Sequence, residues 1–358
     1  MTAVSEPATD QVPTITITSP ADAVAIVPYL LGYHPSLSMV VIMIDGDTAT
    51  AKGVLRFDLP QAAADADDHT TEAVGLLLRY GIGQVLLLGY GPGNRATPVV
   101  DAMRPALADA GIAVCEALRV ADGRYWSYLC TNPSCCPAEG VAFDVSGSVP
   151  AATAVLAGMR ALPDRASLVA TLDPPSGFDR ARGDRVMRQL CSQVRELDGE
   201  DRDWFSDGVE QVTASLDRMQ AGEDLDVSTL AWLGVHLTSV AVRDIVLTRI
   251  ADEDADTHVR LWTEVTRKAP AAFAAPPATL VAFAALSRGD GALARVALER
   301  ALSADPGYTM ALLITQAIDV GMTPAQMFAT DWGGQADAIT AQARQNTTYA
   351  RPVLPEGW

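Results

Sequence analysis

The sequence predicts an α/β domain, built as a mixed sheet with helices, followed by an all-α domain. Two observations carry this prediction: apolar strands alternate with helical segments up to about residue 130, and the strand signal disappears from Pro150 onward. A chain of 358 residues also exceeds one ordinary hydrophobic core. We therefore expect a disordered tail, an α/β domain, a helical domain, and a C-terminal helix and tail, at 1–13, 14–148, 149–335 and 336–358.

Turn and cap residues delimit the elements of the first half. Ser19 can cap a helix over 21–31 that stops at Gly32, since Pro20 suits the first helical position. An apolar strand at 38–44 and a second strand at 50–59 flank Asp-Gly-Asp, which is typical of a hairpin turn. Further helices are expected at 70–80 and 97–110, and further strands at 84–89, 112–120 and 124–130.

The second half reads as successive helices. They are expected at 150–161, 165–172, 179–197, 202–220, 227–249, 257–268, 277–288, 292–304 and 308–320. Within them, 277–308 resembles one tetratricopeptide repeat, because small and apolar residues occupy the packing positions of its second helix and a proline closes the unit. Its first helix departs from the pattern at Ala278 and Ala285. The residues that carry the resemblance are Gly289, Asp290, Ala294, Leu298, Ala301, Asp305 and Pro306.

Charge and hydropathy restrict the partners and the location. The formal net charge is -18, which repels nucleic acid and anionic membrane surfaces, so we expect neither as a partner. The longest apolar run near the start, 23–32, is shorter than the roughly 20 residues of a membrane span. No basic segment precedes that run, so no secretion signal is expected and the prediction is a cytoplasmic protein.

Two motifs are distinctive, and they place the sequence beside a known family. They are LLGYHP at 30–35 and DGRYWSYLCTNPSCCP at 122–137. Together they resemble a domain-of-unknown-function family found mainly in high-GC Gram-positive bacteria, with the resemblance covering roughly 15–330. The resemblance implies no activity, cofactor or site residue.

Four cysteines are expected to lie near one another. A two-residue turn at Asp122-Gly123 pairs the flanking strands so that Cys115 faces Cys130. A proline-bearing loop then returns Cys135 and Cys136 toward Cys130. Because successive side chains of an extended segment alternate faces, we expect those last two thiols to point in different directions.

Three interpretations of these cysteines stay open. They can be structural thiols in a loop held by Pro133 and Pro137, which is the interpretation we favour, since free cysteine is often buried. They can form a disulfide or redox pair of Cys130 with Cys135 or Cys136, although a cytosolic disulfide needs a redox role. They can bind zinc, although the C-x4-C-C spacing lacks the usual pair-of-pairs layout. No cofactor is therefore predicted, and zinc remains the one possible metal.

A glycine-rich turn at 91–96 gives a weaker signal for cofactor binding. Gly91 and Gly93 fit G-x-G-x-x-A between a strand and a helix, where backbone N–H groups can meet a phosphate. Pro92 removes one of those donors, and the turn does not follow the first strand. We favour an ordinary turn.

His34, Arg56 and Asp58 are the weak candidates for catalysis. His34 lies between a helix and a strand, where it can act as a base near neutral pH or, as we favour, cap the carbonyl groups of the helix. Arg56 and Asp58 share one face of a strand and either line a cleft with His34 or form a surface ion pair.

Two functions follow, and the sequence does not decide between them. The first is a non-enzymatic binding or adaptor protein, whose helical domain presents a surface to a protein or peptide partner. The alternative is an enzyme acting on a small molecule, with a cleft at the strand ends near His34 and Gly91. None of the nucleophile-elbow, zinc-protease or phosphate-loop motifs is present.

Overall fold

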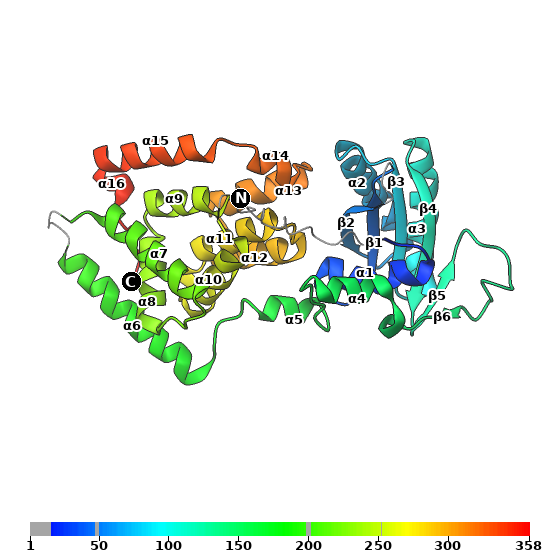
Figure 1. Cartoon of the computed structure of the whole chain (residues 1–358), viewed down its shortest axis with the longest axis horizontal. Helices are drawn as coiled ribbons and strands as arrows, with labels where there is room; N and C mark the ends of the chain where they lie inside the picture. Colours follow the sequence, from blue (N-terminus) through cyan, green and yellow to red (C-terminus); the bar gives the residue numbers. More distant parts are fainter. Residues whose placement is uncertain (1–15, 47–49, 198–201, 252) are drawn as a thin grey trace, which may run out of the picture. The chain divides into compact units, whose positions relative to one another are not determined.

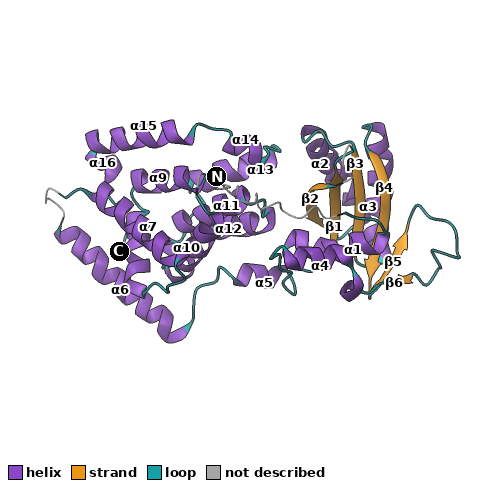
Figure 2. Cartoon of the chain, in the orientation of Figure 1, coloured by secondary structure: helices purple, strands orange, loops and turns teal. Residues whose placement is uncertain are grey.

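The structure is a computed structural model, and it describes residues 16–46, 50–197, 202–251 and 253–358. The tail expected at 1–13 lies outside these residues. The chain divides into two compact units, Met1–Arg165 and Ala166–Trp358. The sequence analysis expected the domain boundary between residues 148 and 149. In the structure the helix that follows this point, Val149–Leu156, packs on the first helix of unit 1. The predicted fold class, a mixed α/β sheet followed by a helical region, is confirmed (Figure 2).

Unit 1 is built on one six-stranded sheet with the strand order β2-β1-β3-β4-β5-β6. β3 and β4 are parallel, and every other neighbouring pair is antiparallel. The predicted hairpin of the first two strands is confirmed, with Val41 opposite Leu55. The strands are β1 (Ser38–Ile44), β2 (Ala51–Asp58), β3 (Gln84–Tyr90), β4 (Ala113–Ala121), β5 (Arg124–Ser127) and β6 (Val141–Ala142).

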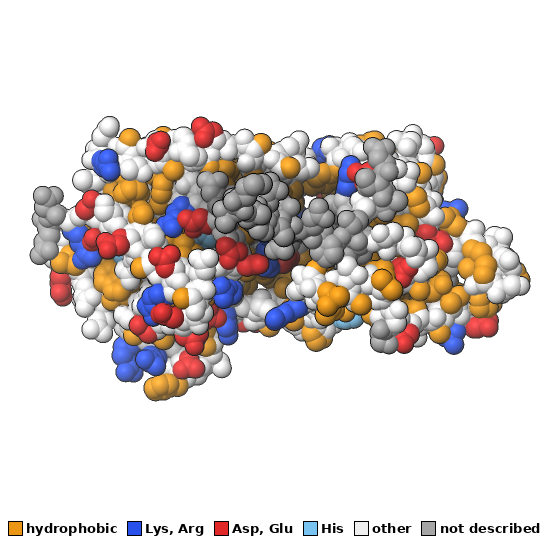
Figure 3. Space-filling model, viewed as in Figure 1, with side chains coloured by type: hydrophobic (Ala, Val, Ile, Leu, Met, Phe, Trp, Pro, Cys, Tyr) orange, Lys and Arg blue, Asp and Glu red, His pale blue; other side chains and the backbone are white. Residues whose placement is uncertain are grey.

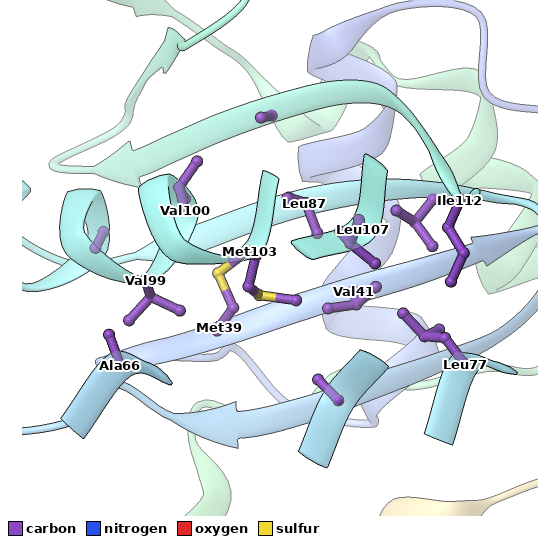
Figure 4. Packing of buried hydrophobic residues seen from close by; sticks show 14 of the residues in the cluster. Met39, Val41, Ala66, Leu77, Leu87, Val99, Val100, Met103, Leu107 and Ile112 are labelled. Carbon is purple, nitrogen blue, oxygen red and sulfur yellow. The ribbon is translucent and has the colours of Figure 1, made fainter. Parts of the chain in front are cut away.

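Helices cover both faces of this sheet. Every second residue of β1 and β3, such as Met39 and Leu87, faces α2 (Ala66–Arg79) and α3 (Gly93–Asp109). Met103 and Leu107 of α3 belong to the same hydrophobic core (Figure 4). The opposite parity faces α1 (Pro20–Leu31), where the Tyr90 hydroxyl donates to the Val24 carbonyl group. α4 (Val149–Leu156) packs beside α1. Because both faces are covered, β1 and β3 are apolar after their first residues, Ser38 and Gln84, rather than alternating.

The predicted caps of α1 explain where it begins and ends. The Ser19 Oγ accepts a hydrogen bond from the Asp22 backbone N–H at 3.1 Å, and Pro20 occupies the first turn. Gly32 ends the helix with φ 73°, a left-handed conformation that glycine adopts without steric cost.

Unit 2 is helical throughout the part that the structure describes. Its largest fully buried side chains are Trp262 and Phe273, and the latter contacts Trp358 at a ring-centroid distance of 5.4 Å. The helices are α5 (Arg165–Ala170), α6 (Gly177–Glu196), α7 (Trp204–Gln220), α8 (Val227–His236), α9 (Val240–Ile250), α10 (Ala255–Lys268), α11 (Ala275–Ser287), α12 (Gly291–Ala304), α13 (Thr309–Asp319), α14 (Pro324–Phe328), α15 (Trp332–Gln345) and α16 (Thr347–Ala350).

The single helix expected over 227–249 is wrong, because α8 and α9 are separate helices that meet at 104°. Ser239 breaks the segment: its Oγ accepts from the Val242 backbone N–H and donates to the Ala350 carbonyl group at 2.7 Å. A buried cap thus restarts the helix and holds the C-terminal segment.

The hydropathy of the described helices bears on whether they could cross a membrane, and their charged side chains bear on the surface of unit 2. None of these helices has by itself the length and apolar character needed to cross a membrane; only α8 and α9 taken together, despite their bend, reach that length and composition. On the face shown in Figure 3, acidic and basic side chains are interspersed over unit 2. Unit 2 also contains ion pairs, such as Arg249 with Glu253 at 2.7 Å.

Candidate metal centre

The hairpin of β4 and β5 positions the loop that carries the cysteines. Asp122 and Gly123 have φ values of 50° and 71°, the two positive angles that a type I′ turn requires. Ala121 then pairs with Arg124, as the sequence predicts. From β5 the chain extends away from the edge of the sheet before it returns as β6 (Figure 1).

Ser127 ends β5 and turns the chain out of the sheet. Its Oγ accepts from the backbone N–H groups of Leu129 and Cys130, at 3.1 and 2.9 Å, and donates to Glu116 Oε1 at 2.9 Å. The ladder therefore stops at Leu118 opposite Ser127. The expected strand over 124–130 is too long, and the pairing of Cys115 with Cys130 does not form.

A second turn, centred on Asn132, folds the segment that follows. The Asn132 carbonyl oxygen accepts from the N–H groups of Cys135 and Cys136, at 3.2 and 2.9 Å. The Asn132 Oδ1 accepts from the Ser134 N–H at 2.9 Å, a turn in which an asparagine side chain holds the backbone two residues on. Because this segment is a turn, the alternation of an extended strand does not apply to it.

The two turns bring three thiols together. The Sγ atoms of Cys130, Cys135 and Cys136 all lie within 4.8 Å of one another, and the first two are 3.1 Å apart. The prediction that Cys135 and Cys136 diverge is therefore wrong. Three sulfur ligands at 2.3 Å from a tetrahedral ion lie about 3.8 Å apart, so small movements of the thiols would accommodate a metal. In the described part of the chain this group has three members and no fourth donor.

The hydrogen bonds among the thiols shift their pKa values in opposite directions. Cys135, the Asn132 backbone and Cys136 stabilise the Cys130 thiolate and lower the Cys130 pKa. The same contact with Cys130 raises the pKa of Cys135 and raises the pKa of Cys136 to about 12. One negative charge in the cluster is therefore favoured and further ones are disfavoured. A bound cation reverses the second effect by attracting every thiolate.

A tryptophan anchors the far end of the cysteine loop, 128–140. The Trp126 Nε1 donates to the Ala138 carbonyl group at 3.0 Å, and the Arg119 guanidinium lies 3.5 Å from the centroid of the indole ring. Gly140, with φ 80°, passes so close that a Cβ there would lie 2.5 Å from Trp126 Cε2. Arg124 Nη1 donates to the Gly140 carbonyl group at 2.8 Å. These contacts close the loop against β5.

Cys115 lies outside the cluster. Its side chain is exposed, and its thiol contacts Gln84 Oε1 at 3.6 Å. The sequence grouped it with the other three because the β4–β5 register was extended past Ser127.

The three candidate catalytic residues do not converge on one cleft. Arg56 forms an ion pair with Asp58 and donates from Nε to the buried Ser38 Oγ at 2.9 Å. His34 is exposed, and its backbone N–H donates to the Leu162 carbonyl group at 2.9 Å. The cap of the preceding helix is made by Gly32 instead. Arg56 and Asp58 thus form an ion pair, in which the Arg56 side chain is 18% exposed and the Asp58 side chain 78%.

An open pocket of about 580 Å³ does lie at this end of the sheet. Its charged and imidazole side chains belong to Asp58, Asp65, His69 and Arg95. The sequence did not single out His69 or Arg95, and Arg95 is the residue that ties this region together: its guanidinium donates to the carbonyl groups of Leu59 and Pro60.

Gly91 and Gly93 make the turn that leads from β3 to α3. Gly91 has φ 150°, and a Cβ there would lie 3.2 Å from Leu59 and 3.3 Å from Leu37. Gly93 begins α3, where an added Cβ would make only ordinary contacts. The tight fit of the first glycine is explained by packing, without a phosphate.

Comparison with known proteins gives one finding. Residues 20–325 match the model of the family described as Domain of unknown function (DUF4192). The chain belongs to this family. No curated protein and no solved structure matches it. The match to DUF4192 spans both units, including the whole cysteine loop, and assigns neither an activity nor a ligand.

Proposed function

We propose that this protein binds a zinc ion through Cys130, Cys135 and Cys136, and that the ion holds the cysteine loop in a fixed conformation. The observation that carries the proposal is the convergence of three thiols within 4.8 Å on one short loop. Zinc is the metal of choice because thiolate ligands in a tetrahedral set suit it, whereas magnesium and calcium take oxygen ligands.

The ligand set favours a non-enzymatic role. Catalytic zinc sites usually use three histidines, two histidines with a carboxylate, or two cysteines with a histidine. Sets of thiolates are typical of structural sites made of four cysteines, or of three cysteines and a histidine, which are four-coordinate, so a structural role here requires water or a further donor in the fourth position. The protein is therefore proposed to act as a zinc-stabilised binding or adaptor protein. A reducing cytoplasm, as the sequence predicts, would keep these thiols free.

The partner is proposed to bind on the helical unit. The likeness of 277–308 to a tetratricopeptide repeat supports a protein or peptide ligand, since such helix pairs present binding surfaces. In the structure α11 and α12 pack against each other, and α11 is buried from Ala275 to Leu286, so a partner of this pair would contact α12.

Metal analysis of purified protein tests the zinc proposal. We expect about one zinc ion per chain, and loss of most of it in Cys130→Ser, Cys135→Ser and Cys136→Ser. Cys115→Ser is the matched control, because Cys115 is an exposed cysteine of the same hairpin outside the cluster. Zinc at 1,000 times its Kd would stabilise the fold by about 4 kcal/mol. A protein that takes up no zinc when reconstituted, or equal loss of zinc in the Cys115 variant, would refute the proposal.

A small-molecule enzyme is the second candidate, and the pocket beside Asp58 supports it. His69 and Arg95 offer a proton-transfer group and a cation there, at the ends of β2 and β3. Thermal-shift screening with small metabolites tests it. A hit lost in His69→Ala and retained in His34→Ala would favour an enzyme, whereas hits insensitive to His69 would count against it.

A further inference from the structure

Two of the three clustered thiols already stand close enough for a second kind of chemistry. The Sγ atoms of Cys130 and Cys135 are 3.1 Å apart, which is about 1 Å longer than a disulfide bond and shorter than the separation that a tetrahedral ion imposes. Neither sulfur is buried: Cys135 is exposed and Cys130 is partly exposed. Oxidants in solution can therefore reach this pair.

We propose that Cys130 and Cys135 are an oxidant-sensitive dithiol, which closes to an intramolecular disulfide in the presence of a hydroperoxide and thereby releases the bound metal. The release of metal rests on the proposed zinc function, whereas the closure of the disulfide stands on the geometry alone.

Backbone geometry selects this pair among the three possible ones. Neighbouring Cα atoms across a trans peptide are about 3.8 Å apart, whereas a disulfide wants at least about 4.4 Å. Cys135 and Cys136 are adjacent in the sequence, so a bond between them would be strained. Cys136 can still pair with Cys130, but Cys135 is the thiol in direct contact with Cys130. Cys136 is therefore left as the unpaired thiol.

The reaction proceeds in two balanced steps. The sulfur of one cysteine of the pair attacks one peroxide oxygen; the O–O bond breaks, a sulfenic acid forms on that cysteine, and the second oxygen leaves as water or an alcohol. The other sulfur, 3.1 Å away, then attacks the sulfenic sulfur, the S–S bond forms, and the hydroxyl group leaves as water. Overall, two thiols lose two electrons and two protons, and one hydroperoxide is reduced.

Closure of the disulfide removes two of the three metal ligands at once. One thiolate, that of Cys136, cannot hold zinc on an exposed loop, so the ion leaves. The turn hydrogen bonds that the Asn132 carbonyl group and side chain accept from backbone N–H groups do not need the metal, so the turn at Asn132 remains while the rest of the loop loses the constraint that the ion supplied.

Differential alkylation of the full chain tests the proposal. Metal-free protein is treated with hydrogen peroxide at one equivalent, unfolded, labelled with a first alkylating reagent, reduced, and labelled with a second. We expect the chain to expose three of its five thiols to the first reagent, with the second label on Cys130 and Cys135 and the first label on Cys136. Cys115 and Cys191 serve as internal controls and should carry the first label.

The same treatment of zinc-loaded protein separates the two proposals. Release of about one zinc ion per disulfide, read with a chromogenic chelator, supports both. A disulfide in a protein that never binds zinc leaves the dithiol intact and refutes only the zinc function. Zinc bound by three cysteines that peroxide does not oxidise, or a second label on Cys136 in place of Cys135, overturns the dithiol. Cys136→Ser should still form the disulfide, which a merely structural role for the loop would not require.

Discussion

Replacing Gly140 with alanine should loosen the cysteine loop, because this glycine meets two separate demands. Its φ of 80° is left-handed, which costs an alanine about 1 kcal/mol. Its missing Cβ also leaves room for Trp126, whose Cε2 would lie 2.5 Å from the added carbon. The Trp126 indole must therefore move away from residue 140.

The magnitude follows from what the displaced indole loses. Its hydrogen bond to Ala138 contributes about 1 kcal/mol, and the stacking of Arg119 on its ring contributes about 0.5–1 kcal/mol. With the backbone cost, Gly140→Ala should lower the free energy of opening of the loop by about 3 kcal/mol. Gly123→Ala is the matched control, since Gly123 has φ 71° and open space where its Cβ would lie. It should cost about 1 kcal/mol.

Hydrogen–deuterium exchange of the 124–142 peptide measures this difference in the intact protein. We expect the Gly140 variant to exchange about 30-fold faster than the Gly123 variant, because each 1.4 kcal/mol is tenfold. Its zinc affinity should fall with the order of the loop. Equal exchange in the two variants would show that contact with Trp126 does not fix the loop, and would refute the reasoning.

Two further predictions concern a buried histidine of unit 2 and the arginine of the pocket in unit 1. Burial between aromatic rings, and to a lesser extent Arg202, lowers the pKa of His236 to about 4. The neutral imidazole therefore contributes its full stabilisation above about pH 6.5, and this contribution is lost as the pH falls from 6.5 to 4. This loss should reach about 3 kcal/mol. Comparing the pH dependence of the free energy of unfolding of the wild type with that of His236→Phe isolates it, and the same pH dependence in both proteins would contradict it. Arg95→Ala should lower the free energy of unfolding, measured by urea titration, by about 2–4 kcal/mol, because two carbonyl groups lose a charged donor. Arg95→Lys can replace one of these hydrogen bonds and should therefore lose less. An equal loss in both variants would count against the role of the hydrogen bonds.

Local signals in the sequence were sufficient to predict the caps and turns of the first half of the fold. Ser19 and Gly32 bound α1 as expected, because caps depend on residues within one turn of the helix. Asp122 and Gly123 likewise made their turn and set the β4–β5 register, since positive φ at both positions is a local property.

The candidate site was predicted only in part, because its geometry depends on side chains that end a regular element. Counting residues along a strand predicted Cys115 opposite Cys130, but the Ser127 side chain takes over two backbone N–H groups and ends the strand first. The Asn132 side chain then accepts from the Ser134 N–H and helps to form the following turn. Ser, Asn and Asp compete with the backbone in this way, and the strand pattern does not record it.

The turns at Ser127 and Asn132 make the conformation of the cysteine loop depend mainly on its own residues. All three thiols, and the carbonyl group that orients two of them, lie between residues 130 and 136. The loop is attached to the hairpin at Ser127, through the indole of Trp126 and through the Arg124 guanidinium. If the proposed metal site exists, a segment this short would carry its ligands in place when grafted onto the hairpin of another sheet.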